Sequence, residues 1–157
     1  MRDLHLPILT SDQRERCDEK LSIGECFNTL KTFQKNKTPG NDGLTVEFYL
    51  VSWPIVGKHL IDCFNYAHDH GALSNSQKQA LITLLEKKGK DKRLIKNWRP
   101  ISLINVDAKI ASITLAKRLE PILPELIQCG QNGYVKERSM EKFPHRSLLH
   151  YACVFNY

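Results

Sequence analysis

The stretch LLEKKGKDKRLIKNWRPISLIN (residues 84–105) decides the fold, because an apolar segment opens into a basic loop and a second apolar segment follows it. Residues 87–99 hold seven Lys and Arg side chains and one acid, Asp91, so their net charge is +6. This charge equals the formal charge of the whole chain. Because Lys and Arg neutralise polyanions and release their counterions, the loop is suited to binding phosphate; a solvated charged loop is the alternative.

Two apolar segments flank this loop. Residues 80–85 have the character of a buried strand, and residues 101–104 have that of a returning strand. A hairpin is the shortest connection between them. The sequence therefore predicts a β-hairpin with a basic loop.

Charge is distributed unevenly along the chain. Residues 1–78 contain nine basic and ten acidic side chains, whereas residues 79–157 contain fourteen and seven. The two halves therefore carry −1 and +7. This asymmetry predicts an anionic partner for the second half, namely nucleic acid or nucleotide phosphate.

Length and composition indicate one globular domain, since 41% of the 157 residues are hydrophobic and 25% are charged. No apolar run approaches the roughly 18 residues of a membrane span, and the first ten residues lack the apolar core of a secretory signal. We therefore expect an intracellular protein, cytoplasmic or nuclear, without a membrane partner. The five cysteines form no C-x-x-C pair, and Cys26 and Cys63 are predicted to be small core residues.

The N-terminal part is predicted to be helical. Residues 11–20 form a short polar helix, and Ser22 with Glu25 three residues later marks the start of a second helix. This second helix is expected to turn an apolar face inward, formed by Cys26, Phe27, Leu30 and Phe33.

A tight turn is predicted at residues 39–43, because two glycines and an Asn-Asp pair tolerate positive φ. Asp42 or Thr45 then caps a short helix over residues 46–53. Pro54 suits the first position of a separate helix, which ends near Gly71. The apolar stripe of that helix is expected to contain Val56, Leu60, Cys63, Phe64 and Ala67.

Asn105 or Asp107 is expected to open a longer helix, which Pro121 and Pro124 break into a short second piece. Its side chains expected to be buried are Val106, Ile110, Ile113, Leu115 and Leu119. Residues 129–139 are basic and contain glycine, which indicates another strand or hairpin. The order of helices, hairpin, helix and hairpin predicts an α+β fold, mainly helical, with one or two β-hairpins.

Three segments in sequence order resemble one protein family. They are NKTPGNDGLTVEFY (36–49), LITLLEKKGKDKRLIKNWRPISLINVDAKI (81–110) and QNGYVKERS (131–139). They resemble the first three conserved blocks of reverse transcriptases from non-LTR retrotransposons of the long interspersed element type. The resemblance implies a partial right-hand polymerase, with a helical lead-in (1–35), fingers blocks up to the approach to the palm (36–140) and a divergent tail (141–157).

The resemblance also implies specific contacts. In this family a basic hairpin closes over the incoming nucleoside triphosphate, so Lys87, Lys88 and Arg99 would bind its phosphates. The Arg99 guanidinium is a rigid bidentate fork; pairing with a carboxylate that holds the hairpin closed is the alternative. Nucleic-acid contacts are implied for the remaining positions: Lys37, Gly40, Asp42, Gly43, Lys90, Lys92, Arg93, Lys96, Tyr134, Lys136 and Arg138.

The implied partners are an RNA template, a DNA primer and a deoxynucleoside triphosphate. Polymerase chemistry needs paired carboxylates that hold two divalent metal ions, and the aspartate strand and Tyr-x-Asp-Asp hairpin of the family are not found in this sequence. The tetrad at residues 66–69, Tyr-Ala-His-Asp, precedes the fingers block, so a structural role is predicted for it. We therefore expect no catalytic residue, metal site or cofactor in this chain, and Mg²⁺ only in the complete parent enzyme.

The function predicted from the sequence is that of a truncated reverse transcriptase domain (RNA-directed DNA polymerase), inactive alone, which keeps template and nucleotide contacts. A residual, non-catalytic nucleic-acid-binding module is the first alternative. The second is a decayed reading frame whose product does not fold stably, because an isolated fingers piece exposes apolar helix faces.

Overall fold

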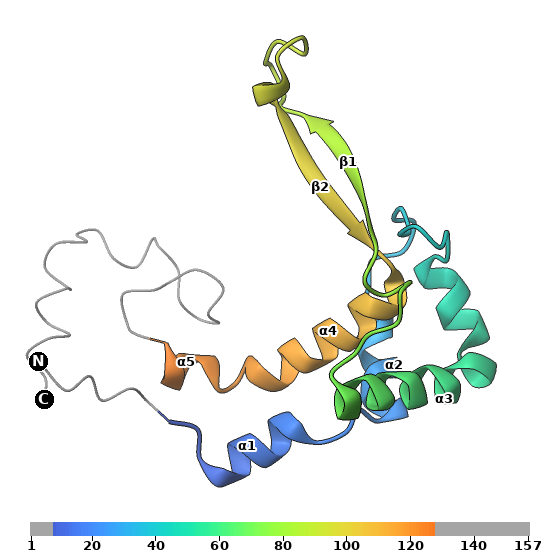
Figure 1. Cartoon of the computed structure of the whole chain (residues 1–157), viewed down its shortest axis with the longest axis vertical. Helices are drawn as coiled ribbons and strands as arrows, with labels where there is room; N and C mark the ends of the chain where they lie inside the picture. Colours follow the sequence, from blue (N-terminus) through green and yellow to red (C-terminus); the bar gives the residue numbers. More distant parts are fainter. Residues whose placement is uncertain (1–7, 128–157) are drawn as a thin grey trace, which may run out of the picture. The chain divides into compact units, whose positions relative to one another are not determined.

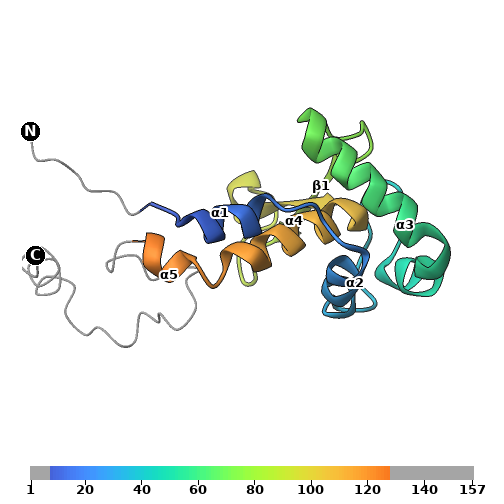
Figure 2. The same cartoon turned by 90° about the horizontal axis from the view of Figure 1, so that it is seen from below.

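The computed structural model describes residues 8–127, which divide between two compact units. The larger unit contains residues 20–114, and the smaller one contains residues 8–19 and 115–127 (Figures 1 and 2). The elements in chain order are α1 (Ser11–Asp18), α2 (Ile23–Lys31), α3 (Val46–His70), β1 (Ala80–Glu86), the 3₁₀ turn η1 (Ile95–Asn97), β2 (Trp98–Ile104), α4 (Val106–Leu119) and α5 (Leu123–Leu126).

Helix and strand are both present in the described residues, and the sheet there has two strands. The further strand or hairpin predicted at residues 129–139, and the tail 141–157, lie outside the described residues. The arrangement of a right-hand polymerase therefore stays a prediction.

Helix α2 begins and packs as its sequence predicts. The Ser22 hydroxyl accepts a hydrogen bond from the Glu25 amide at 3.2 Å, and Cys26 and Leu30 are fully buried. Phe27 stacks on Trp53 of α3, with ring centroids 5.5 Å apart. The predicted inward face of α2 is confirmed, and it forms the core of the larger unit with α3 and the beginning of α4.

Helix α3 is one helix of 25 residues, whereas the sequence predicted two helices that meet at Pro54. Thr45 caps its first turn, and Gly71, with a φ of 64°, ends it in the left-handed conformation. Pro54 has no N–H, and such a residue inside a helix costs about 3 kcal/mol; Figure 1 shows the helix changing direction along its length. The helix continues because the buried positions keep their spacing on both sides of Pro54: Trp53, Gly57, Ile61 and Phe64.

The predicted apolar stripe of α3 is correct only in part. Phe64 is buried, and Val56 and Leu60 are partly buried against the core. Cys63 is exposed, so its predicted core position is wrong. The reason is that the buried ridge passes through Ile61 and Phe64 and leaves Cys63 on the solvent side.

Gly57 makes room for the indole of Trp53. A Cβ atom at position 57 would lie 2.9 Å from Trp53 Cε2 and 3.0 Å from Nε1. The indole is buried, and its Nε1 has no hydrogen-bond acceptor among the described residues. The close approach of helix backbone and ring therefore depends on glycine.

The predicted hairpin is confirmed. Strands β1 and β2 pair antiparallel, with Ala80 opposite Ile104 and Glu86 opposite Trp98, and both strands are longer than predicted. The predicted burial of the first strand is wrong, since Ile82 is 66% exposed and Leu85 is 50% exposed. Burial of a sheet face requires a second layer of structure, and residues 20–114 supply none over this ribbon.

The predicted turn at residues 39–43 is also confirmed. The Gly43 amide donates to the Gly40 carbonyl oxygen at 3.3 Å, and Gly43 has a φ of 71°. Asp42 Oδ1 accepts the Leu44 amide at 3.0 Å. A Cβ atom at Gly40 would lie 2.1 Å from Asn105 Oδ1, so only glycine permits this approach.

Asn105 joins three segments of the larger unit. It directly follows β2, and it is 1% exposed. Its Nδ2 donates to the carbonyl oxygen and the hydroxyl of Ser76 at 3.1 and 3.0 Å, and its Oδ1 accepts the Asp42 amide at 3.4 Å. Its carbonyl oxygen accepts the Lys109 amide at 3.2 Å, so the predicted start of the next helix is confirmed.

Helix α4 buries a narrow ridge formed by Val106, Ile110 and Thr114. The predicted burial of three further side chains is wrong, because each is more than one third exposed: Ile113, Leu115 and Leu119. They lie on either side of the buried ridge. Pro121 and Pro124 follow α4, and α5 is a separate short helix, as predicted.

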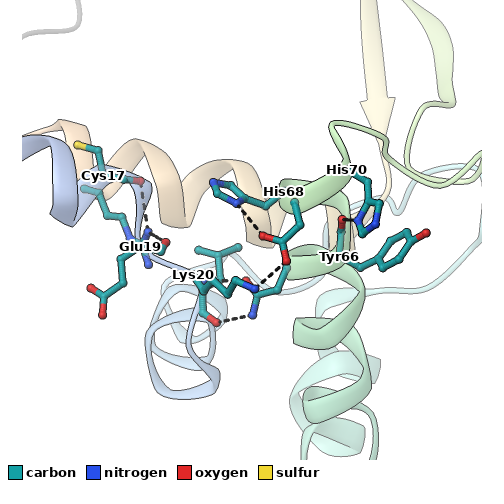
Figure 3. Close-up of polar contacts among 10 residues, drawn as sticks. Cys17, Glu19, Lys20, Tyr66, His68 and His70 are labelled. Atoms are coloured by element: carbon teal, nitrogen blue, oxygen red, sulfur yellow. Dashed lines mark hydrogen bonds and ion pairs between the residues drawn. The ribbon is translucent and has the colours of Figure 1, made fainter.

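Polar contacts hold the two segments of the smaller unit together. Gln13 Nε2 of α1 donates to Glu125 Oε2 of α5 at 2.9 Å. The Arg118 guanidinium donates to the main-chain oxygens of Cys17 and Glu19 (Figure 3). One arginine therefore binds the main chain at the end of α1.

Replacing Gly57 with alanine should destabilise the protein. Alanine normally stabilises a helix interior by about 1 kcal/mol relative to glycine, but overpacking against Trp53 should outweigh this gain and lower the free energy of unfolding by about 1–3 kcal/mol. Urea unfolding followed by circular dichroism measures the change. Gly24→Ala in α2 is the matched control, because a Cβ atom there meets nothing within 4 Å. Equal stabilisation of both variants would contradict the expected clash.

Replacing Asn105 with alanine should lower the free energy of unfolding by about 2–4 kcal/mol, because buried partners lose their hydrogen bonds. Asn41→Ala is the control, since Asn41 lies in the same turn and its exposed amide donates to Gln79 at 3.0 Å. The control should change stability by at most about 0.5 kcal/mol. Similar losses in the two variants would show that Asn105 has no special role.

Candidate nucleic-acid interface

The loop between β1 and β2 is folded. Gly89, with a φ of 72°, permits its first turn. The Asp91 carboxylate accepts the Arg93 amide at 2.9 Å, and the Asp91 carbonyl oxygen accepts Asn97 Nδ2 at 2.8 Å. The one acid of this basic segment therefore shapes the loop, and it forms no ion pair within residues 8–127.

Two further contacts tie the loop to the strands. Trp98 Nε1 donates to the Lys92 carbonyl oxygen at 2.9 Å. Lys92 Nζ lies 2.5 Å from Oε2 of Glu86, which is the residue opposite Trp98 in the ribbon. Both side chains of this ion pair are largely exposed, so it contributes at most about 1 kcal/mol. Its main effect is to neutralise one of the seven basic side chains.

Lys87 also has a structural contact. Its Nζ donates to the Lys96 carbonyl oxygen at 2.7 Å, across the loop. An ammonium group has three N–H donors, so this bond leaves two of them for a phosphate oxygen. The geometry therefore fixes the position of Lys87 without removing its charge.

Five basic side chains of the hairpin are exposed and have no hydrogen-bond or ion-pair partner among residues 8–127. Like charges so close in the chain repel one another, and a bound polyanion relieves this repulsion. We call this group the tip cations; they are Lys88, Lys90, Arg93, Lys96 and Arg99.

Arg99 differs from the other tip cations because it lies in a strand. It pairs with Leu85, and Pro100 follows it opposite Leu84. The alternative that Arg99 pairs with a carboxylate to close the hairpin finds no support in the described residues, where Arg99 forms no ion pair. A strand holds the backbone of this arginine more firmly than a loop would.

The predicted contacts at residues 37–43 lie at the other end of the ribbon. Strands of seven residues span roughly 20 Å, so the turn beside Asn105 is far from the tip cations. The amides of Asp42 and Gly43 already have acceptors within the protein, and Gly40 is required for the approach to Asn105. These three residues therefore have structural roles, while Lys37 is exposed. Tyr134, Lys136 and Arg138 lie outside the described residues.

Two carboxylates lie near the base of the hairpin. Tyr49 of α3 is buried there, and burial raises its pKa, with further increases from the nearby carboxylates of Asp107 and Asp42. At the start of α3, the Asn36 amide donates to Glu47 Oε1 at 2.6 Å and lowers the pKa of that carboxyl group. Carboxylates therefore lie near the base of the hairpin, together with the basic residues Lys78 and Lys109.

The tetrad at residues 66–69 makes structural contacts (Figure 3). Lys20 Nζ lies 2.7 Å from Asp69 Oδ2, and this hydrogen bond lowers the pKa of Asp69. His68 Nδ1 lies 3.6 Å from Asp69 Oδ1, and the ring of Tyr66 stacks on that of His70. These contacts support the structural role predicted for the tetrad. In residues 8–127 no three His, Cys, Asp or Glu side chains are grouped so that they could hold a metal ion.

The sequence predicted Asn105 only as the start of a helix, and it did not single out Asn97 and Trp98, which shape the loop. Asn105 stands between Ile104 and Val106, and a lone amide between apolar residues is a signal for a buried polar contact. Trp98 and Asn97 gave no comparable signal, because their partners are carbonyl oxygens of the loop.

Among the described residues, no helix has the length and hydrophobicity that crossing a membrane requires. No protein-family model matches the chain. Over 149 residues, 94% of its length, the chain is 38% identical to an uncharacterized 149 kDa protein of transposon TX1 from Xenopus laevis. The chain spans 11% of the length of that relative. This similarity supports an origin of the sequence in a transposon.

Proposed function

We propose that the chain is the fingers part of a non-LTR retrotransposon reverse transcriptase, and that its own activity is to bind polynucleotide phosphates through the hairpin tip. The observation that carries the proposal is the set of five exposed tip cations, whose side chains have no partner within residues 8–127. The resemblance of three ordered segments to the reverse transcriptase blocks supports it, and so does the similarity to a transposon protein.

The loop contacts explain how the tip would bind without first having to fold. Asp91, Asn97 and Trp98 fix the loop backbone through hydrogen bonds. Less conformational entropy is then lost on binding, so more of the electrostatic attraction appears as affinity. Arg99 would contribute a bidentate contact to a phosphate, whether in a polynucleotide or in a deoxynucleoside triphosphate.

The donor set of the described residues does not fit the two Mg²⁺ ions of polymerase chemistry, which need converging carboxylates. Asp69 is bound by Lys20, Asp42 accepts the Leu44 amide, and Asp107 accepts the Ala108 amide. We therefore assign no step of nucleotide transfer to these residues. RNA template, DNA primer and deoxynucleoside triphosphate are proposed as partners of the complete enzyme.

A non-catalytic nucleic-acid-binding module is the second candidate, because the tip cations alone would support it. The two candidates differ in their ligands. The fingers of a polymerase should bind deoxynucleoside triphosphates as well as polynucleotides, and binding of the triphosphate should weaken when Arg99 is replaced by Lys, which has no planar fork. A simple module should show no such dependence.

The logarithm of the affinity for single-stranded RNA and DNA should fall linearly with the logarithm of the salt concentration, because binding releases counterions. Lys88→Glu and Arg93→Glu should each lower the affinity and reduce the salt slope by about 1 or more. Fluorescence anisotropy measures both quantities. Lys58→Glu, on the exposed side of α3, makes the same change in net charge and is the control. Binding that does not depend on salt concentration, or equal losses of affinity in all three variants, would refute the assignment of binding to the tip cations.

Primer extension with Mg²⁺ should show no incorporation by the purified chain, because Asp69, Asp42 and Asp107 have structural partners and the described carboxylates do not group into a metal site. A complete reverse transcriptase under the same conditions provides the positive control. Template-dependent incorporation by this chain alone would overturn the assignment of a purely binding role.

A further inference from the structure

The outer edge of β1 carries unpaired main-chain groups. The Lys87 amide donates to the Asn97 carbonyl oxygen at 2.8 Å, in the same register as the strands. Antiparallel pairs alternate between bonded and non-bonded positions, so the odd residues of β1 bond to β2 and the even ones point away from it. The N–H and C=O groups of Ile82, Leu84 and Glu86 therefore face outward, without partners among the described residues.

The outer edge of β2 is different. By the same alternation, Trp98, Pro100 and Ser102 face outward on that strand. Pro100 has no N–H. Because its nitrogen faces away from β1, no hydrogen bond to β1 is lost, but the row of main-chain donors on the outer edge of β2 is interrupted in its middle. An additional strand could pair continuously with β1 and could not do so with β2.

The β1 edge also lacks the features that normally protect an edge strand. Such edges usually carry charged residues, proline or a bulge. From Ala80 to Leu85 there is neither charge nor proline, and Leu84 is 47% exposed. A two-stranded ribbon is also marginally stable by itself, so a further strand would stabilise it.

We propose that two copies of this chain pair antiparallel along their β1 edges and form a four-stranded sheet. Among the registers that pair outward groups, the one that uses the whole of β1 places Ala80 opposite Glu86 and Ile82 opposite Leu84 of the other copy, with Thr83 on the two-fold axis. The inference concerns association of the chain with itself and does not depend on the proposed function.

Charge favours this arrangement. An antiparallel pair places the two basic tips at opposite ends of the sheet, which keeps their repulsion small.

Pro100 limits the assembly to two copies. After the β1 edges have paired, only the two β2 edges remain free, and each is interrupted by Pro100. Strand addition therefore closes at the dimer and does not continue into a filament.

Sedimentation velocity over a range of protein concentrations tests the proposal with the full chain. The chain should form a discrete dimer, and Leu84→Pro should weaken it by at least about tenfold, because symmetry removes two hydrogen bonds at once. Ser102→Pro makes the same change at the outer edge of β2 and should leave the dimer intact. A monomer at all concentrations, or a dimer that Leu84→Pro does not weaken, would overturn the proposal.

A cross-linking measurement does not depend on the fold of a proline variant. In the proposed register the Thr83 residues of the two copies form a non-bonded pair with Cα atoms about 4.5 Å apart, which suits a disulfide. Thr83→Cys should therefore link position 83 to position 83 on mild oxidation, as peptide mapping would show. Ile82→Cys is the matched control and should not link to itself. Equal yields at both positions, or no link at position 83, would refute the register.

Discussion

The buried amide of Asn105 is the contact on which the larger unit depends. Its side chain joins the loop before β1 to the glycine turn at residues 39–43, and the main-chain oxygen of the same residue accepts the Lys109 amide at the start of α4. A buried amide is costly unless its donors and acceptors have partners, and here both ends of the group have them. These hydrogen bonds hold the place at which the hairpin leaves the helices.

Local features of the fold were predictable from the sequence, since each depends on a few neighbouring residues. The cap at Ser22, the stop at Gly71 and the hairpin belong to this class. Continuity of α3 through Pro54 was not predictable, because it depends on packing that outweighs the local cost of proline. Exposure of the two strands was equally unpredictable. An apolar sequence shows that burial would be favourable, but it does not show which element of the fold would cover the strand.

The charge of the candidate interface could be counted from the sequence, but the role of each cation could not. Lys87 and Lys92 make contacts within the hairpin, whereas Lys88 and Arg93 make none among the described residues. The difference arises from the path of the loop backbone, which Asp91 directs. A sequence motif marks such a segment as basic, and only its folded geometry separates the cations that shape the loop from those left for a ligand.

The two-residue repeat of the ribbon limits how this sequence can change over evolutionary time. Loss of a single residue from β2 between Arg99 and Ile104 would turn the arginine to the opposite face of the sheet, because successive side chains alternate. If the Arg99 side chain is to stay on its face of the sheet, residues can be added to or removed from the ribbon only two at a time, and equally on both strands. Single insertions and deletions should therefore accumulate in the connecting loop, where no alternation has to be preserved.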